Sequence, residues 1–221
     1  MRLLATGGFF LVVCCGAAFA LSRELGFEAS PLNNAYVSSY EIVNTFEHSP
    51  DAFTQGLTFD EAGNLYESDG LYGKSAVRQI DVLSGKTLAK TSNERAHFGE
   101  GLQVVDGRMF QLTWKENVLH EYKVPSLERV KTHALPCSPH CKEGWGLAYD
   151  GESKLYLTDS TDKLFTLDAK TLQPIGSHRR IYDPFLGRAI NGVNELEWVD
   201  GEVRHHSARR ALRILSQTTR G

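Results

Sequence analysis

The sequence predicts an all-β fold made of a repeated four-stranded unit, and two observations lead to this prediction. The first is a repeat: three glycine-leucine pairs end at Leu57, Leu102 and Leu147, so consecutive copies are 45 residues apart. The second is that turn residues divide each copy at the same places into short runs of alternating apolar and polar residues. A period of this length is typical of repeat architectures.

The first repeat shows the order of the expected strands. After Gly56 and Leu57 it contains a turn signal at 61–64, an alternating run at 65–69, a third run at 77–80, a turn at 83–86 and a more polar fourth run. Four strands in about 45 residues predict one blade of a β-propeller. Paired-helix repeats would need apolar residues at helical spacing, which residues 53–168 lack.

One position in each repeat carries the functional prediction. Two residues before each shared leucine stand Gln55, Glu100, Trp145 and, before Leu196, Asn194. The first strand of each propeller blade lines the central channel, so we expect these side chains to converge at one mouth. A carboxylate held among aromatic rings would have a raised pKa and could transfer protons near neutral pH. The alternative is that Gln55 and Glu100 only bond neighbouring backbone amides.

Aromatic residues recur at the same edge of the repeats. Trp114 lies 45 residues after Asp69 and 45 before Asp159, and Phe53 and Phe98 stand where two successive first strands begin. A single tryptophan is often part of a core. Two tryptophans at equivalent edges of adjacent blades, together with the phenylalanines, favour an aromatic pocket.

The ends of the chain differ from its body. An uncharged run from Leu3 to Ser22 follows Arg2 and predicts, for residues 1–22, either a cleaved signal peptide or a retained membrane anchor. We expect a linker at 23–39, the propeller at 40–203 and a divergent basic tail at 204–221. The protein is therefore expected in the secretory pathway, secreted or anchored with the propeller on the lumenal or extracellular side.

Charge and cysteine content limit the partners. The formal net charge is −3 although residues 203–221 carry five arginines and no acids, so the remaining body is acidic, which argues against a nucleic-acid partner. Cys137 and Cys141 form either a small loop disulfide or, with His140, a metal site. These groups are too few and too close for a tetrahedral site, which favours the disulfide. We expect no metal and no cofactor.

The motifs together resemble the plant-type glutaminyl cyclases, five-bladed propellers that are also found in bacteria. The resemblance covers residues 40–203 and depends on six motifs: FTQGL at 53–57, ESDGLYG at 67–73, FGEGL at 98–102, FQLTW at 110–114, EGWGL at 143–147 and NELE at 194–197. It implies a glutaminyl-peptide cyclotransferase, which converts the N-terminal glutamine of peptides or proteins to pyroglutamate and releases ammonia without a metal or cofactor.

The family's site residues match positions of this chain. The resemblance implies catalytic roles for Glu100, as the proton-transfer group, and Asn194. It implies substrate binding by Phe53, Gln55, Phe98, Trp114 and Trp145. The residues picked out by the repeat and those implied by the family therefore coincide.

The sequence departs from the family's pattern after Val203. Ala208 stands where the family has a further pocket tryptophan, and a last repeat with a pocket lysine has no counterpart. We expect about three complete repeats and a partial fourth, truncated or divergent at the C-terminal side, and an enzyme impaired by loss of the last blade. The alternative is a non-catalytic propeller that binds peptide N-termini or a protein partner.

Overall fold

The computed structural model describes residues 9–13, 18–27, 38–183, 187–207 and 210–214, and within them the secondary structure is all β. Three antiparallel sheets have four strands each, and every sheet follows the order of the chain. They are β4 (Thr54–Phe59), β5 (Leu65–Asp69), β6 (Ala76–Ile80) and β7 (Thr87–Ser92); β8 (Gly99–Val105), β9 (Arg108–Thr113), β10 (Val118–Lys123) and β11 (Arg129–Ala134); and β12 (Leu147–Tyr149), β13 (Lys154–Thr158), β14 (Lys163–Asp168) and β15 (Arg179–Arg180).

Smaller sheets complete the described structure. Strands β18 (Val193–Val199), β19 (Glu202–Ser207) and β20 (Arg210–Ile214) form a three-stranded sheet, and β16 (Tyr182–Asp183) pairs with β17 (Arg188–Ala189). Near the N-terminus, β1 (Phe9–Val13), β2 (Ala18–Phe27) and β3 (Ser38–Glu47) pair in that order. Strands thus occupy parts of the segments expected as leader, linker and basic tail, while export itself stays a prediction. Within the described part of the chain, no helix is long and apolar enough to cross a membrane.

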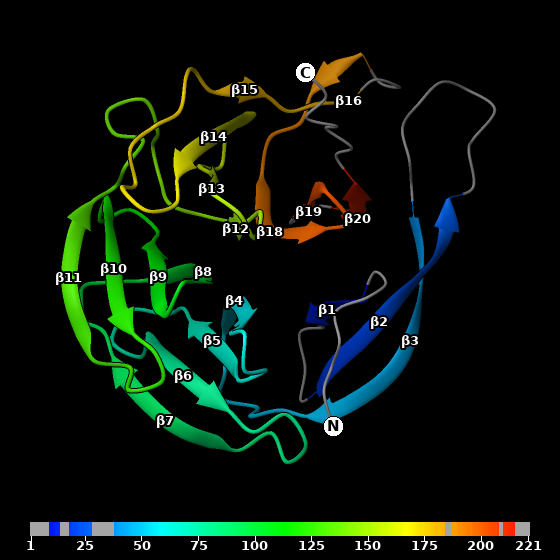
Figure 1. The fold of residues 1–221 in the computed structure, drawn as a ribbon, viewed down its shortest axis with the longest axis vertical. Coiled ribbons are helices and arrows are strands. Elements are labelled where there is room, and N and C mark those ends of the chain that lie inside the picture. Colours follow the sequence, from blue (N-terminus) through cyan, green and yellow to red (C-terminus); the bar gives the residue numbers. More distant parts are fainter. Residues whose placement is uncertain (1–8, 14–17, 28–37, 184–186, 208–209, 215–221) are drawn as a thin grey trace.

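The sheets are arranged around a common centre, as in a propeller-like fold (Figure 1). The first strands β4, β8, β12 and β18 lie nearest the centre, and the last strands β7, β11 and β15 lie on the outside. Neighbouring inner strands contact one another, β4 with β8, β8 with β12 and β12 with β18. The expected four-stranded repeat and its inner first strand are therefore confirmed.

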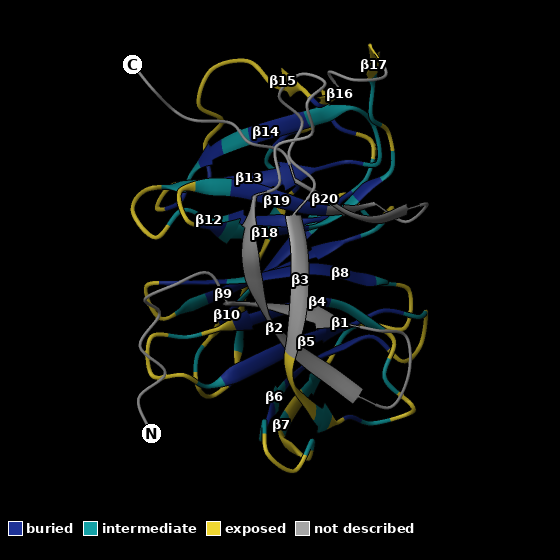
Figure 2. Cartoon of the chain, turned by 90° about the vertical axis from the view of Figure 1, so that its right-hand side faces the viewer, coloured by how far each residue is buried: buried dark blue, intermediate teal, exposed yellow. Residues whose placement is uncertain are grey.

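The hydrophobic core lies between adjacent sheets. Phe110 and Leu119 of the second sheet pack in one cluster with Leu155 of the third. Tyr66 of the first sheet packs with Met109 of the second. Figure 2 shows strands such as β8 and β13 largely buried and the connecting turns exposed. The outer strands β7, β11 and β15 are mostly exposed. Because each sheet covers its neighbour's apolar face, the repeats stabilise one another and hold their inner strands in place.

The repeated glycines allow the inner strands to approach closely. A Cβ atom on Gly101 would lie 2.4 Å from the carbonyl oxygen of Trp145, and one on Gly56 would lie 2.5 Å from the amide nitrogen of Leu102. The backbone amide of Gly101 also donates a hydrogen bond of 2.8 Å to that Trp145 oxygen. The 45-residue glycine repeat is therefore a packing requirement at the centre of the ring.

A disulfide joins Cys137 and Cys141 in the connection between β11 and β12. Both cysteines are buried in the cluster shared by the second and third sheets. The disulfide alternative is thus the one that the structure contains. The crosslinked loop leads directly to Glu143 and Trp145.

Candidate active site

The inner strands carry a β-bulge at the predicted site positions. The register shifts between Thr54 and Gly56 in β4, between Gly99 and Leu102 in β8, and between Val193 and Leu196 in β18. Each shift places one extra residue in the inner strand relative to its partner strand. Bulges re-aim side chains, so this irregularity, shared by β4, β8 and β18, turns residues at equivalent positions out of the regular alternation.

Two of the predicted residues meet directly. The Nε2 atom of Gln55 donates a hydrogen bond of 2.9 Å to Oε2 of Glu100. The Glu100 side chain is buried, with the residue only 4% exposed. The two side chains therefore form a hydrogen bond with each other. The alternative, in which they bond only neighbouring backbone amides, does not describe this contact.

The environment of Glu100 raises its pKa to about 8. Burial is the main cause, because a carboxylate loses its hydration there, and the negative charges of Glu143 and Glu116 add to it. The hydrogen bond from Gln55 acts in the opposite direction but does not cancel the effect. At neutral pH the protonated and ionised forms are both accessible, which suits a group that accepts and returns a proton.

An aromatic cluster stands beside this carboxyl group. The Phe98 ring contacts Phe53 edge to face at 6.1 Å between centroids, Trp114 at 5.5 Å and Tyr72 at 5.5 Å. Phe53 and Tyr72 are 46% and 50% exposed, so one side of the cluster faces solvent. Gly70 leaves room for Phe98, since a Cβ atom there would lie 2.5 Å from its ring. Exposed, contiguous apolar rings of this kind are typical of binding surfaces.

Two carboxylates orient the aromatic residues. Glu143 Oε2 accepts hydrogen bonds from the indole nitrogens of Trp114 at 2.8 Å and Trp145 at 2.7 Å. Glu116 accepts one from the Tyr72 hydroxyl at 3.0 Å and one from the backbone amide of Phe98 at 3.2 Å. The Glu143 carboxylate thus ties together two tryptophans that come from different repeats.

Asn194 occupies the equivalent position on β18. Its backbone oxygen accepts a hydrogen bond of 3.1 Å from the Thr158 hydroxyl. Its side-chain oxygen Oδ1 is buried and has no hydrogen-bond partner among the described residues. Burial, followed by the charges of Glu197 and Glu100, raises the pKa of the adjacent Glu195 well above its usual range. This part of β18 therefore lies within electrostatic reach of Glu100.

A buried ion cluster supports the start of β4. Asp69 accepts a hydrogen bond of 3.1 Å from the backbone amide of Phe53 and pairs with Arg78 at 2.7 Å. Arg78 also pairs with Glu67 at 2.8 Å. The equivalent Asp159 accepts a hydrogen bond of 3.1 Å from the backbone amide of Lys142. These aspartates anchor the segments that lead into the inner strands, while Trp114 at the same repeat position supplies a ring instead.

The structure therefore brings most of the predicted residues into a network of two contact groups, which are coupled by the charges that Glu143 and Glu116 exert on Glu100. It joins Gln55 to Glu100, Phe53 and Trp114 to Phe98, and Trp145 to Trp114 through Glu143. The sequence reasoning missed three members of this network: Tyr72, Glu116 and Glu143. Glu143 opens the third copy of the repeated motif and Tyr72 lies between two glycines, but neither has an equivalent in the other repeats that would have marked it.

Fold and site together define an all-β, propeller-like protein with a buried carboxyl group of raised pKa and a partly exposed aromatic cluster. Residues 12–217 match the family model described as glutamine cyclotransferase, and the chain belongs to that family. It is 40% identical over 167 residues to a glutaminyl-peptide cyclotransferase from Arabidopsis thaliana, a match that covers 76% of this chain and 50% of that protein. The chain thus spans about half the length of the curated relative it matches.

Solved structures show the same architecture. The crystal structure of Myxococcus xanthus glutaminyl cyclase superposes with a TM-score of 0.64 at 27% identity, covering 76% of this chain and 66% of that one. The structure of U3-55K superposes with a TM-score of 0.50 at 11% identity, covering 76% of this chain and 52% of that one, a likeness of fold alone.

Proposed function

We propose that this protein is a glutaminyl-peptide cyclotransferase, which converts an N-terminal glutamine to pyroglutamate and releases ammonia. The observation that carries the proposal is Glu100, a buried carboxyl group with a pKa of about 8 that is hydrogen-bonded to Gln55. Membership of the glutamine cyclotransferase family and the names of the relatives support it.

The reaction needs one proton carrier. The α-amine of the substrate attacks its own side-chain amide carbon, a new C–N bond forms, and the C–N bond to the amide nitrogen breaks. Glu100 in its ionised form takes the proton from the attacking amine and delivers it to the leaving nitrogen, which departs as ammonia. The amine loses one proton, ammonia gains it, and Glu100 returns to its starting form.

Amide side chains hold the reacting groups. Gln55 orients the Glu100 carboxyl group through its hydrogen bond of 2.9 Å. In this proposal Asn194 bonds the substrate, and its amide group stabilises the oxygen on which negative charge develops. The buried Oδ1 of Asn194, which has no partner among the described residues, supports this role. Phe53, Phe98, Trp114 and Trp145 bind the substrate, exclude water and hold the flexible glutamine in a folded conformation.

We further infer a ring of the five-bladed type. In it, the three four-stranded sheets are complete repeats and β18–β20 belongs to the fourth. The 45-residue offset of the first three repeats and the contacts between neighbouring inner strands up to β18 support this reading. An experimental structure of the chain tests this inference. A ring in which β18–β20 does not follow the third sheet as the next blade would contradict it.

We also propose that the protein enters the secretory pathway, because the uncharged run after Arg2 has the character of an export signal. Expression with a C-terminal reporter followed by fractionation tests this. Recovery of the reporter in the cytosol alone would contradict it.

A non-catalytic propeller that binds peptide N-termini is the second candidate, and the half-exposed rings of Phe53 and Tyr72 favour a binding surface. Mass spectrometry separates the two functions. A cyclase converts a glutamine-initiated peptide into a product lighter by one ammonia, whereas a binding protein retains the peptide unchanged.

A further inference from the structure

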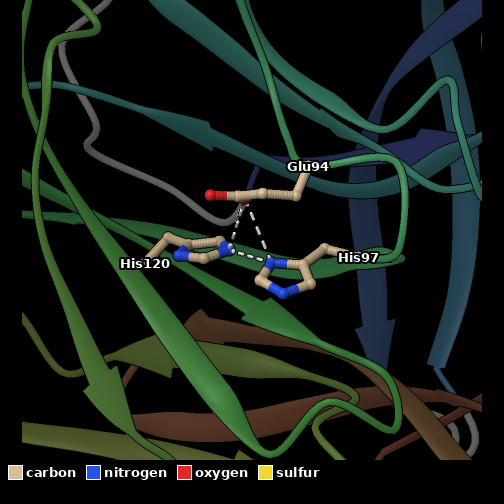
Figure 3. A group of neighbouring side chains, drawn as sticks. All are labelled: Glu94, His97 and His120. Carbon is tan, nitrogen blue, oxygen red and sulfur yellow. Dashed lines mark hydrogen bonds and ion pairs between the residues drawn. The ribbon is translucent and has the colours of Figure 1, made fainter.

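Three potential metal ligands that take no part in the proposed reaction lie together (Figure 3). Glu94 and His97 belong to the connection between β7 and β8, and His120 belongs to β10 of the second sheet. His97 Nδ1 lies 2.9 Å from His120 Nε2 and 3.2 Å from Glu94 Oε2, and His120 Nε2 lies 3.9 Å from the same oxygen. One nitrogen or oxygen atom of each residue therefore points toward a shared point.

We propose that these three residues form a binding site for a divalent transition metal ion of the zinc type. Zinc in proteins binds histidine nitrogens and carboxylate oxygens at about 2.0–2.2 Å with tetrahedral geometry, which places neighbouring ligand atoms roughly 3.3 Å apart. The two separations from His97, 2.9 and 3.2 Å, lie close to that spacing, and the one between His120 and Glu94, 3.9 Å, is wider. Two imidazoles and one carboxylate are a ligand set suited to zinc, and the fourth position is left for water.

The surroundings of His120 hold it in a ligating state. The His120 side chain is fully buried, and its other ring nitrogen, Nδ1, lies 3.0 Å from the Thr132 hydroxyl. A proton on Nδ1 that is donated to Thr132 leaves the lone pair of Nε2 directed at the proposed site. Such an outer partner for a metal-binding histidine is common, because it fixes the tautomer and the ring orientation.

Arg129 limits the affinity of the site. Its guanidinium group binds the Glu94 carboxylate through two nitrogens, one of them at 2.6 Å. It orients the carboxylate in the way that outer partners do, but its positive charge repels a bound cation. Replacement by a neutral residue that can still donate a hydrogen bond is therefore expected to tighten metal binding.

The proposed ion would have a structural consequence for the neighbouring site. Glu94 and His97 lie just before Phe98, Gly99 and Glu100. An ion shared with His120 would tie this connection to β10 and restrict the backbone that positions Phe98 and Glu100. Metal binding is a property separate from the proposed cyclase activity, and zinc affinity can be measured without an activity assay.

The test uses the tag-free full chain, stripped with a chelator and titrated with zinc chloride by calorimetry. We expect one saturable equivalent of zinc, a thermal midpoint raised by zinc, and at least about a tenfold loss of affinity in Glu94→Gln, His97→Gln and His120→Gln. His133→Gln is the matched control, because it removes another strand histidine, one that pairs with Glu121 at 2.6 Å, and should keep wild-type affinity.

Two further measurements keep the result decisive. Circular dichroism checks folding, and if the buried His120 variant does not fold, the more exposed His97 and Glu94 variants decide the question. Arg129→Gln should bind zinc at least as tightly as the wild type. Absence of saturable zinc binding to the folded wild type, or equal binding by the His97, Glu94 and His133 variants, would overturn the proposal.

Discussion

Gln55 and Glu100 stand 45 residues apart at equivalent positions of successive repeats, and their side chains are joined by a hydrogen bond of 2.9 Å. Each lies in the bulge of its own inner strand. The repeat thus brings the Gln55 carboxamide and the Glu100 carboxyl group together at the centre of the ring. The carboxamide orients the carboxyl group through this hydrogen bond. The predictions that follow start from this pair.

Glu100 should make the stability of the protein depend on pH. Its pKa rises from 4.5 to about 8 on folding, so its stabilising contribution is complete below pH 4.5 and is lost as pH rises through 8. Chemical denaturation at several pH values should show the free energy of unfolding falling over this window, by up to about 5 kcal/mol from this residue.

The variant Glu100→Gln isolates that effect. It should show a flatter pH dependence than the wild type, while Glu195 and Glu197, whose pKa values are also raised, remain in both proteins. Glu152→Gln, in an exposed turn, serves as the control. Identical pH dependence of the wild type and Glu100→Gln would contradict the raised pKa.

Glu143→Ala should loosen both tryptophans of the site. It removes the acceptor of the Trp114 and Trp145 indole hydrogen bonds, and it also removes a negative charge that raises the pKa of Glu100. We expect a changed tryptophan emission spectrum and a peptide KM raised about tenfold, the cost of roughly one lost charge-assisted hydrogen bond. Unchanged emission and KM would show that Glu143 does not orient the rings.

Phe98→Leu should weaken peptide binding, because the ring packs against Phe53, Tyr72 and Trp114. We expect the loss of these aromatic contacts to weaken the free energy of peptide binding by about 1 kcal/mol, which raises KM roughly fivefold. Phe59→Leu is the matched control, since Phe59 is an exposed phenylalanine at the end of β4. Equal effects of the two substitutions would argue against the aromatic cluster as the binding surface.

Gly101→Ala should destabilise the ring by about 1–3 kcal/mol, the usual cost of forcing an extra carbon into a packed region. The added Cβ atom would lie 2.4 Å from the Trp145 carbonyl oxygen, so β8 and the segment that leads into β12 would have to separate. Thermal unfolding measures the effect. An unchanged midpoint would mean that the inner strands do not need their close approach.

The regular features of the molecule could be predicted from the sequence. The 45-residue offset predicted the four-stranded repeat and aligned Gln55 with Glu100 because equivalent positions of a repeat occupy equivalent places in space. The offset also marked the glycines, but only the structure shows that Gly101 faces the backbone of the next inner strand. The bulges that re-aim Gln55 and Glu100 have no separate signal in the sequence.

Contacts made by side chains that occur in one repeat only could not be predicted in this way. Glu143 bonds two tryptophans, and His97 approaches His120 from a connection in the chain rather than from a matching repeat position. Such contacts depend on how adjacent sheets are rotated and spaced, and a repeat pattern carries no information about side chains found in one repeat only.

The most direct test of the account is ammonia release by the purified full chain from a glutamine-initiated dipeptide, with Glu100→Gln measured alongside. We predict pyroglutamyl product and ammonia in equal amounts, with a rate at least about a hundredfold lower in Glu100→Gln, as expected for loss of a general acid/base. Equal rates in the two proteins, or no release by a folded wild type that still binds the peptide, would contradict the assignment of Glu100 as the proton carrier.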